Sequence, residues 1–356
     1  FRIYPNTEQQ ILFAKTFGCV RFIYNRMLSD KIKHYEKTKE NLYCYPSQYK
    51  SEFEWLKEVD SLALVGAYNN LKSAYNNFFR DKKVGFPKFK AKKNHHLSYT
   101  TNCVNGNIRL QDNYLILPKV KAIKIKQHRE IPQDYLLKSV TVSKTPSGKY
   151  FASILFEYER NIKQIVPQSY IGLDFSMKEL YIASDGSSAC YPRYYRLALD
   201  KLAKESRKLS KMEKGSNNRN KQRIQVARLH EKVANQRKDF LHKLSRQITN
   251  AYDCVCIEDL DMKGMSQALN FGKSVADNSF GAFVTMLGYK LSEQGKQLIK
   301  IDKWFPSTKT CSNCGSVQTI SLEERTYTCK SCGVVINRDY NASINIRNEG
   351  MRLVSI

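Results

Sequence analysis

The sequence has little negative charge and no long run of apolar residues. Asp and Glu number 33 against 59 Lys and Arg, which gives a formal net charge of +26. The apolar stretches are only a few residues long, whereas a membrane-spanning helix needs about 20, so we expect neither a spanning helix nor a signal peptide. Nucleic acid then becomes the leading partner, and a basic surface kept for solubility is the alternative.

The motifs of several enzyme classes are also absent. There is no G-x-x-x-x-G-K-S/T phosphate loop, which argues against energy-driven remodelling of a substrate. The six histidines show no zinc-protease spacing, and no Ser-His-Asp arrangement can be nominated. The chemistry must therefore come from other residue types.

Ten cysteines are present, but they do not form the pattern of a disulfide framework. Four make two Cys-x-x-Cys pairs near the C-terminus, and the other six are scattered in apolar or strand-like contexts. A reduced intracellular compartment fits this arrangement better. With 356 residues, 42% of them apolar, the chain suits two or three folded domains. Because it begins at Phe1, we expect a short segment to precede it.

The N-terminal region predicts a short strand followed by two helices. Residues 2–4 form the strand, and Thr7 with Gln10 resembles a capping box at the start of the first helix. Apolar residues recur at helical spacing in both helices. They are Val20, Ile23, Tyr24, Met27 and Leu28 in the first, and Leu64, Tyr68, Leu71, Tyr75, Phe78 and Phe79 in the second. We interpret the aromatic stripe as core packing, with base stacking as the alternative.

Positive charges alternate with aromatic residues directly after the second helix. Lysines in such a segment can neutralise phosphates while Phe86 or Phe89 stacks or anchors the loop, which Pro87 stiffens. The alternative is a solvated linker whose phenylalanines plug a core. The candidate nucleic-acid contacts here are Arg80, Lys82, Lys83, Lys88, Lys90, Lys92 and Lys93.

From about residue 98 to residue 160 the hydrophobic period changes from helical spacing to two. The alternating residues predict a small antiparallel β unit, plausibly a barrel, with a hairpin turn at residues 146–148. They are Leu115 and Leu117, Ile123 and Ile125, Val140 and Val142, and Phe151, Ser153 and Leu155. Residues 161–168 are polar and serve as a linker.

The C-terminal half predicts buried strands and a long helical hairpin. Residues 170–174 and 254–258 are buried strands that each end in an acid, and residues 297–301 form another strand. Residues 196–250 form a hairpin broken near Gly215. Its second arm carries charges that are almost all positive, which a solvated face does not require. From that arm we select Arg223, Arg228 and Lys232 as nucleic-acid contacts.

The two Cys-x-x-Cys pairs predict a structural zinc site. Cys311 and Cys314 are separated from Cys329 and Cys332 by the fourteen residues 315–328, close to the spacing of zinc ribbons. A glycine follows the second cysteine of each pair, where backbone amides turn toward the sulfur. Four thiolates leave no open position, so the site is structural; an iron–sulfur cluster or free thiols are the alternatives.

Three acidic residues predict a second, catalytic metal site. Asp174 and Glu258 each end a buried strand, and Asp339 lies at the start of a helix directly after the cysteine module. Acids delivered to one edge of a sheet can share two divalent cations for hydrolysis of a phosphodiester by in-line attack. We interpret Asp185, Asp259 and Asp261 as turn, loop or cap residues.

These residues resemble those of a known family. Residues 171–174, 257–265 and 337–346 resemble the three separated RuvC motifs of TnpB, the OrfB-type protein of insertion sequences and a relative of the type V CRISPR effectors. The four-cysteine ribbon belongs to the same pattern. Further similar segments are residues 4–10, 17–26, 85–90 and 305–314, so the resemblance covers essentially the whole chain.

The resemblance implies a fold and a domain organisation. The expected fold is α/β with a small β-barrel: a RuvC/RNase H-like nuclease domain with an inserted helical hairpin and a zinc ribbon, preceded by a wedge-type β-barrel that carries a helical recognition insert. The implied boundaries are residues 1–5 and 95–160 for the barrel, 6–94 for the recognition insert with its basic loop, 161–168 for the linker, 169–305 for the nuclease, 306–336 for the ribbon, and 337–356 for the last RuvC motif and C-terminal helix.

The resemblance also implies an activity, RNA-guided cleavage of double-stranded DNA beside a short target-adjacent motif. Asp174, Glu258 and Asp339 match the family's catalytic acids and would hold two Mg²⁺ ions, and the cysteines would hold one Zn²⁺. The partners would be a guide RNA from the element's end and the target DNA. We expect a monomer with its RNA in the cytoplasm of a prokaryotic cell, associated with the nucleoid.

Three other functions are compatible with parts of this pattern. A nuclease-idle relative would act as a guided DNA-binding repressor, which the intact acid triad argues against. A transposase that joins DNA strands could use the same triad. A guide-independent RNase H or junction resolvase would not need residues 1–160.

Overall fold

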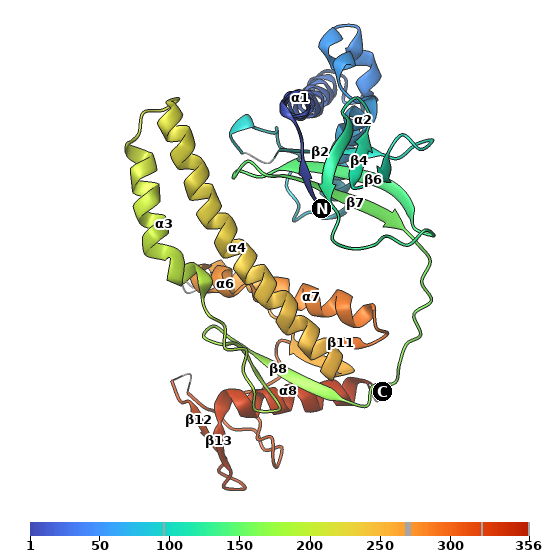
Figure 1. Cartoon of the computed structure of the whole chain (residues 1–356). Coiled ribbons are helices and arrows are strands. Elements are labelled where there is room, and N and C mark those ends of the chain that lie inside the picture. Colours follow the sequence, from blue (N-terminus) through green and yellow to red (C-terminus); the bar gives the residue numbers. More distant parts are fainter. Residues whose placement is uncertain (95–96, 268–271, 322, 355–356) are drawn as a thin grey trace. The chain divides into compact units, whose positions relative to one another are not determined.

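The computed structural model of the chain describes residues 1–94, 97–267, 272–321 and 323–354 (Figure 1). The chain divides into two compact units, Phe1–Arg160 and Asn161–Ile356. The boundary lies at the start of the segment that the sequence marks as a linker. No helix in the described ranges is both long enough and apolar enough to span a bilayer.

The first unit contains a seven-stranded sheet in which every neighbouring pair is antiparallel. The strand order is β2-β6-β7-β1-β5-β4-β3, so the N-terminal strand lies in the middle of the sheet. Among the described residues no pairing joins β2 to β3, so closure into a barrel stays a prediction. The strands are β1 (Arg2–Tyr4), β2 (Leu97–Asn102), β3 (Arg109–Gln111), β4 (Tyr114–Leu117), β5 (Lys121–Lys126), β6 (Leu136–Lys144) and β7 (Tyr150–Glu157).

Two long helices lie between β1 and β2 in the chain. They are α1 (Thr7–Thr38) and α2 (Ser61–Arg80), with short 3-10 turns at η1 (Pro46–Lys50), η2 (Glu54–Glu58) and η3 (Lys92–Asn94). The predicted capping box at the start of α1 is wrong by one residue. The cap is Asn6, whose side chain accepts the amide of Gln9 at 2.9 Å while the Gln9 side chain accepts the amide of Asn6.

The helices and the sheet of the first unit share one hydrophobic core. All five members of the predicted stripe in α1 are buried, as predicted, and so are Leu64 and Leu71 of α2. The predicted inward face of β7 is wrong, because Tyr150 and Ala152 are buried whereas Leu155 is 59% exposed. Tyr150, Ala152, Ile154 and Phe156 form an uninterrupted apolar set, whereas the predicted set includes Ser153, so the alternation itself indicates the face that is buried.

The second unit is built on a four-stranded mixed sheet. Its strands are β8 (Tyr170–Ser176), β9 (Leu180–Ala183), β10 (Cys254–Glu258) and β11 (Gln297–Ile301), in the order β11-β10-β8-β9. The pairings of β10 with β8 and with β11 are parallel, and β9 is antiparallel to β8. Parallel strands bring their carboxyl ends to one edge. Glu258 ends β10 as predicted, whereas Asp174 lies two residues before the end of β8, which continues to Ser176.

Helices cover both faces of this sheet (Figure 1). Helices α4 (Asn217–Ala251) and α7 (Phe280–Ser292) pack on the face that carries Ile171, Leu173 and Ile257. Helix α8 (Arg338–Val354) packs on the other face, where Ile346 meets Cys254 and Cys256.

The remaining elements surround this sheet. Helix α3 (Tyr194–Lys211) pairs with α4 in the predicted hairpin, which turns at Gly215 with a φ of 94°. Two short helices, α5 (Met262–Gln267) and α6 (Gly272–Asn278), follow β10, and β12 (Thr326–Thr328) pairs with β13 (Val335–Asn337) in a two-stranded ribbon before α8.

Candidate active site and metal centre

The strand register brings Asp174 and Glu258 side by side. Leu173 of β8 is paired with Ile257 of β10, so the residues that follow them are neighbours on adjacent strands. Leu173 and Ile257 face α4 and α7, and alternation along a strand turns the next residue to the opposite face. Both carboxylates therefore project toward α8, and Asp174 is only 8% exposed.

Asp339 reaches the same region from the first turn of α8. Its carboxylate accepts hydrogen bonds from Nε and Nη2 of Arg338, both at 3.1 Å, and lies 3.6 Å from Arg325. Burial is the main cause that raises the pKa of Asp174 well above its usual value, and the charges of Glu258 and Asp339 raise it further. The negative charges of both other acids therefore act on Asp174.

Glu258 is held by a residue from the loop after β11. Ser307, which is 3% exposed, donates its hydroxyl to Glu258 Oε1 at 2.5 Å. The backbone carbonyl of Ser307 accepts the side-chain amide of Asn345 in α8 at 2.8 Å. Burial raises the pKa of Glu258, and the Ser307 hydrogen bond opposes this rise. Ser307 thus ties the end of β10 to α8.

The three carboxylates are neighbours, but they do not converge on one point. In the described ranges, one group of metal-ligating side chains has all its ligand atoms within 4.8 Å of one another, and this group is the four cysteines. The three acids do not form such a group. The hydrogen bonds from Arg338 hold the carboxylate of Asp339. Carboxylate oxygens are the ligands that Mg²⁺ prefers, and a bound cation would relieve the repulsion around Asp174.

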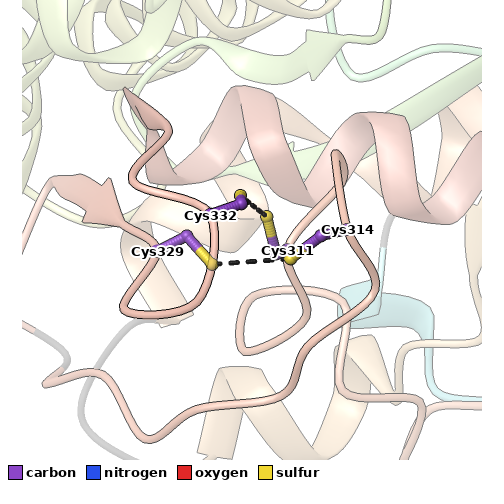
Figure 2. A group of neighbouring side chains, drawn as sticks. All are labelled: Cys311, Cys314, Cys329 and Cys332. Atoms are coloured by element: carbon purple, nitrogen blue, oxygen red, sulfur yellow. Dashed lines mark hydrogen bonds between the residues drawn. The ribbon is translucent and has the colours of Figure 1, made fainter.

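The four predicted zinc ligands do converge (Figure 2). The sulfurs of Cys311 and Cys332 are 3.7 Å apart, and those of Cys314 and Cys329 are 3.6 Å apart. A disulfide bond would need about 2.05 Å. Four thiolates arranged tetrahedrally about 2.3 Å from a zinc ion would be roughly 3.8 Å apart. The geometry is that of a closed four-sulfur metal site.

Each cysteine pair forms the same turn. Backbone amides of residues 313 and 314 point to the sulfur of Cys311, and amides of residues 331 and 332 point to the sulfur of Cys329. The glycine after each pair has a φ near 75°, at 77° for Gly315 and 74° for Gly333. The prediction of a turn at these glycines is therefore confirmed. Their own amides, however, donate to the carbonyls of Cys311 and Cys329.

The cysteine turns are attached to α8, the helix that carries Asp339. Asn341 accepts the amide of Ser312 at 2.9 Å and donates to the carbonyl of Thr310 at 2.7 Å. Asn345 donates to the same carbonyl at 2.7 Å. Strand β13 also runs directly into α8 without a loop. A metal bound by the cysteines therefore fixes the start of the helix that presents Asp339.

The seven predicted nucleic-acid contacts of the first unit all lie on its surface. Arg80 and the six lysines are exposed, while Pro87 between them is buried. Phe86 packs edge-on against Tyr75 and Phe78 at 5.6 and 5.4 Å, so it anchors the segment. Phe89 is 55% exposed and is the one of the two that remains available for stacking. The side chain of Asn25 brackets the backbone of Lys90 with two hydrogen bonds.

The three predicted contacts in α4 differ from one another. Arg228 and Lys232 are exposed, whereas Arg223 is partly buried. Arg237, which interrupts the apolar spacing of this helix, forms an ion pair with the buried Asp277 at 3.3 Å. The excluded acids behave as predicted: Asp185 and Asp261 accept turn amides, and Asp259 pairs with the exposed Lys300 at 2.9 Å.

Sequence reasoning missed four residues that shape the site. Ser307 and Arg338 contact two of the acids, but a single serine or arginine carries no signal in the sequence. Gly172 and Gly350 allow α8 to lie directly on the sheet, since a Cβ at Gly172 would lie 2.1 Å from the carbonyl of Ser343. Glycine within a buried strand is the one signal that could have indicated this close approach.

Three family models match parts of the chain. They are described as "Probable transposase" of the OrfB type over residues 153–269, "Cas12f1-like, TNB domain" over residues 280–346, and "Helix-turn-helix domain" of OrfB over residues 1–40. A protein of Streptomyces pristinaespiralis is 33% identical over 99% of this chain and 88% of its own length. This chain belongs to the OrfB (TnpB) family.

Relatives of this TnpB-family chain carry a consistent name. The Streptomyces protein is named "Putative RNA-guided DNA endonuclease", and so is InsQ of Escherichia coli K12, which is 28% identical over 98% of this chain and 91% of its own length. A solved Cas12f1–sgRNA–target DNA complex matches with a TM-score of 0.59, 14% identity, and coverage of 96% of this chain and 83% of that one. This likeness shows a shared fold.

Proposed function

We propose that this TnpB-family chain is an RNA-guided DNA endonuclease. The observation that carries the proposal is the intact set of Asp174, Glu258 and Asp339 in a chain that matches, over nearly its whole length, relatives named for that activity. The guide would be an RNA from the element's end, and the substrate would be double-stranded DNA beside a short target-adjacent motif. The net charge of +26 suits the binding of RNA and a heteroduplex, and we infer that one copy of the chain acts with its RNA.

The catalytic chemistry we infer is hydrolysis of a phosphodiester. Asp174, Glu258 and Asp339 would hold two Mg²⁺ ions, which when bound supply activation of the attacking water and stabilisation of the leaving 3′ oxygen. The residues of the chain orient and insulate this centre. Ser307 fixes the carboxylate of Glu258, and burial keeps bulk water from Asp174. Arg338 holds Asp339 and must release it if all three acids are to share ions.

The cysteine cluster would hold one Zn²⁺ ion in a structural role. Four thiolates favour zinc over harder cations, and amides directed at two of the sulfurs stabilise the thiolate form. The hydrogen bonds of Asn341 and Asn345 would transmit this rigidity to the first turn of α8.

The first unit and the helical hairpin would bind the nucleic acids. The sheet of residues 1–5 and 95–160 would form the wedge-type barrel, and residues 6–94 the recognition insert. The exposed basic residues of the segment at 80–93 and of α4 would contact phosphates. Because the substrate is DNA, we infer that the protein acts in the prokaryotic cytoplasm on nucleoid DNA.

Cleavage of a plasmid by the purified protein–RNA complex in Mg²⁺ tests this function. Asp174→Ala should lower the cleavage rate by at least about 100-fold, since even residues that only support a metal ligand contribute 10- to 100-fold. Asp261→Asn is the matched control, because this nearby acid only accepts the amides of Lys263 and Gly264. If Asp174→Ala cleaves like the wild type, the assignment of the active site is wrong.

Other outcomes of the same assay separate the competing functions. Occupancy of the target without a nick or cut would identify a guided repressor. Strand-joined products would identify a transposase. Cleavage that persists after removal of residues 1–160, or after digestion of the RNA, would identify a guide-independent nuclease.

A further inference from the structure

Trp304 is the most exposed large apolar side chain on the described surface of the second unit. Its exposed fraction is 80%, whereas Trp55, the other tryptophan of the chain, is 41% exposed and packs against Phe22 and Phe53. Among the described residues, the contact recorded for the Trp304 ring is with Lys303, whose Nζ lies 4.9 Å from the ring centroid. A large aromatic ring is thus accessible to a ligand that binds at this surface.

The backbone around Trp304 is firmly held. The Asp302 side chain accepts the amide of Trp304 at 2.7 Å, and the Asp302 carbonyl accepts the amide of Phe305 at 3.0 Å. On either side, Ile301 is fully buried and Phe305 packs in the core between the sheet and α8. The ring therefore projects from a rigid turn, so little conformational entropy would be lost when a ligand binds it.

This turn leads directly to the active site. Ser307, three residues after Trp304, is the residue whose hydroxyl contacts Glu258 at 2.5 Å. Three residues of chain span at most roughly 11 Å. Stacked nucleotides of one strand are about 3.4 Å apart, so this reach corresponds to about three nucleotides. A strand with its phosphate at Glu258 that runs toward this turn would reach Trp304 within about three nucleotides.

The charges around the turn allow a nucleic-acid strand to approach. Three carboxylates line the hollow beside the turn, those of Asp259, Asp261 and Asp302. Asp259 is paired with Lys300 at 2.9 Å, and the charges of Lys263 and Lys303 act on Asp261, so the lysines offset the acids. Lys303 lies beside the ring and can contact the phosphate of a stacked nucleotide. A ring with an adjacent cation is the combination by which proteins bind single strands without reading their sequence.

We propose that Trp304 is a base-stacking subsite of the nuclease centre, which holds a nucleobase of the DNA strand being cut within about three nucleotides of the phosphate at Glu258. The inference rests on the proposed function and adds to it a residue that positions the substrate. Because stacking engages the face of any base, the subsite is independent of sequence. Its purpose is to hold the unwound strand in register with the carboxylates.

Tryptophan fluorescence gives a direct test that needs no cleavage. In a Trp55→Phe variant, Trp304 is the sole tryptophan, because the chain has two. The complex with guide RNA is titrated with matched target DNA in a buffer that lacks Mg²⁺ but contains no chelator, so that the cysteine site keeps its zinc, and stacking should quench the Trp304 emission. The protein that carries both Trp55→Phe and Trp304→Phe, and therefore has no tryptophan, is the control and should not respond. Emission of Trp304 that is unchanged by DNA, or already quenched by the RNA alone, overturns the proposal.

Cleavage of substrates with single abasic sites identifies the stacked nucleotide. Trp304→Ala should slow cleavage about 5- to 150-fold, the equivalent of 1–3 kcal/mol per stacked base. Trp304→Phe, which retains an aromatic face, should lose less than about 5-fold. An abasic site at the stacked position should slow the wild type by the same factor and leave Trp304→Ala unaffected. A Trp304→Ala defect that is equally large on every abasic substrate overturns the proposal.

These readouts fail separately from the proposed function. If the complex binds target DNA with quenching of Trp304 but does not cut it, the endonuclease activity is wrong and Trp304 remains a base-stacking site for the bound DNA. If the complex cuts DNA, Asp174→Ala abolishes cutting, and neither the fluorescence nor the abasic series responds, the endonuclease stands and the subsite is wrong.

Discussion

The cysteine cluster and the carboxylate triad lie in the same unit but are built in opposite ways. The cysteines come from two short turns, and their sulfurs already lie within 4.8 Å of one another. The acids come from β8, β10 and α8, and they do not converge at that distance. A closed set of ligands suits a structural metal, whereas a catalytic site must keep room for ions, water and substrate.

The charge balance differs in the same way. The turns of the ribbon direct backbone amides at the sulfurs of Cys311 and Cys329, which stabilises negative charge there. At the triad, burial and mutual repulsion disfavour the charged form of Asp174. Neighbouring backbone amides thus stabilise the negative charge of the cysteine cluster. The triad, in contrast, retains an unfavourable electrostatic energy that a bound cation would relieve. The coupling between the two is the hydrogen-bonded attachment of the ribbon to α8.

Removal of one sulfur ligand should have the largest effect, because it damages both sites. We expect Cys311→Ser to abolish stoichiometric zinc binding, to make residues 306–336 sensitive to proteases, and to slow DNA cleavage at least about 100-fold, since Asp339 loses its support. Zinc content measured by atomic absorption and cleavage rates measured on the same samples check this. Cys190→Ser, at an exposed cysteine outside the cluster, should leave both values unchanged. Full cleavage without zinc would show that the two sites are independent.

A methyl group added to the sheet beneath α8 should lower the stability of the protein and its cleavage rate by an intermediate amount. A Cβ at Gly172 would lie 2.1 Å from the carbonyl of Ser343 and 2.6 Å from the amide of Arg347, both of which are backbone atoms. We expect Gly172→Ala to destabilise the protein by about 1–3 kcal/mol and to slow cleavage, because α8 must move and carries Asp339 with it. At about 2–4 °C per kcal/mol, thermal unfolding would detect this.

Gly281→Ala is the matched control for this change. Gly281 lies in α7, where a Cβ would meet no atom within 4 Å. Its replacement should be neutral or slightly stabilising, because alanine favours a helix. Equal stability of the two variants would mean that α8 does not lie as close to β8 as described.

The smallest expected effect is a gain in stability on neutralising the triad. The pKa of Asp174 is raised in the folded state, mainly by burial, so the folded protein retains a proton that the unfolded chain loses. The stability of the wild type without Mg²⁺ should therefore fall as pH rises from the usual Asp pKa to this raised value. Asp174→Asn removes the loss, and its melting temperature in a buffer without Mg²⁺ or chelator should exceed that of the wild type at neutral pH.

The pH dependence and a second substitution make this prediction specific. The advantage of Asp174→Asn should vanish toward about pH 3, below the usual Asp pKa, where Asp174 is protonated in both states. Asp261→Asn should give no gain, because backbone hydrogen bonds lower the pKa of that exposed acid. A melting temperature of Asp174→Asn below that of the wild type at every pH would contradict the repulsion described for the triad.

The acids and the cysteines of this site could be predicted from the sequence, but the residues that hold the acids in place could not. Asp174 and Glu258 end two apolar runs, and that pattern sufficed to place them at one edge of a sheet. The contacts of Ser307 with Glu258 and of Arg338 with Asp339 join residues whose types are common and whose spacing carries no period. The face of β7 was predicted wrongly for another reason, since Phe151 and Leu155 were given more weight than Ser153, which lies between them on the exposed face.

The sequence by itself determined the features that depend on neighbours in the chain. Two Cys-x-x-Cys pairs with their glycines define the sulfur turns, apolar periodicity defines α1 and α4, and the excess of basic residues defines the class of partner. The tertiary structure alone decided how the three acids meet. That meeting requires the parallel register of β8 and β10 and the close seat of α8 on Gly172, which are contacts between segments far apart in the chain. Such contacts are selected by packing over the whole unit and leave no local period in the sequence.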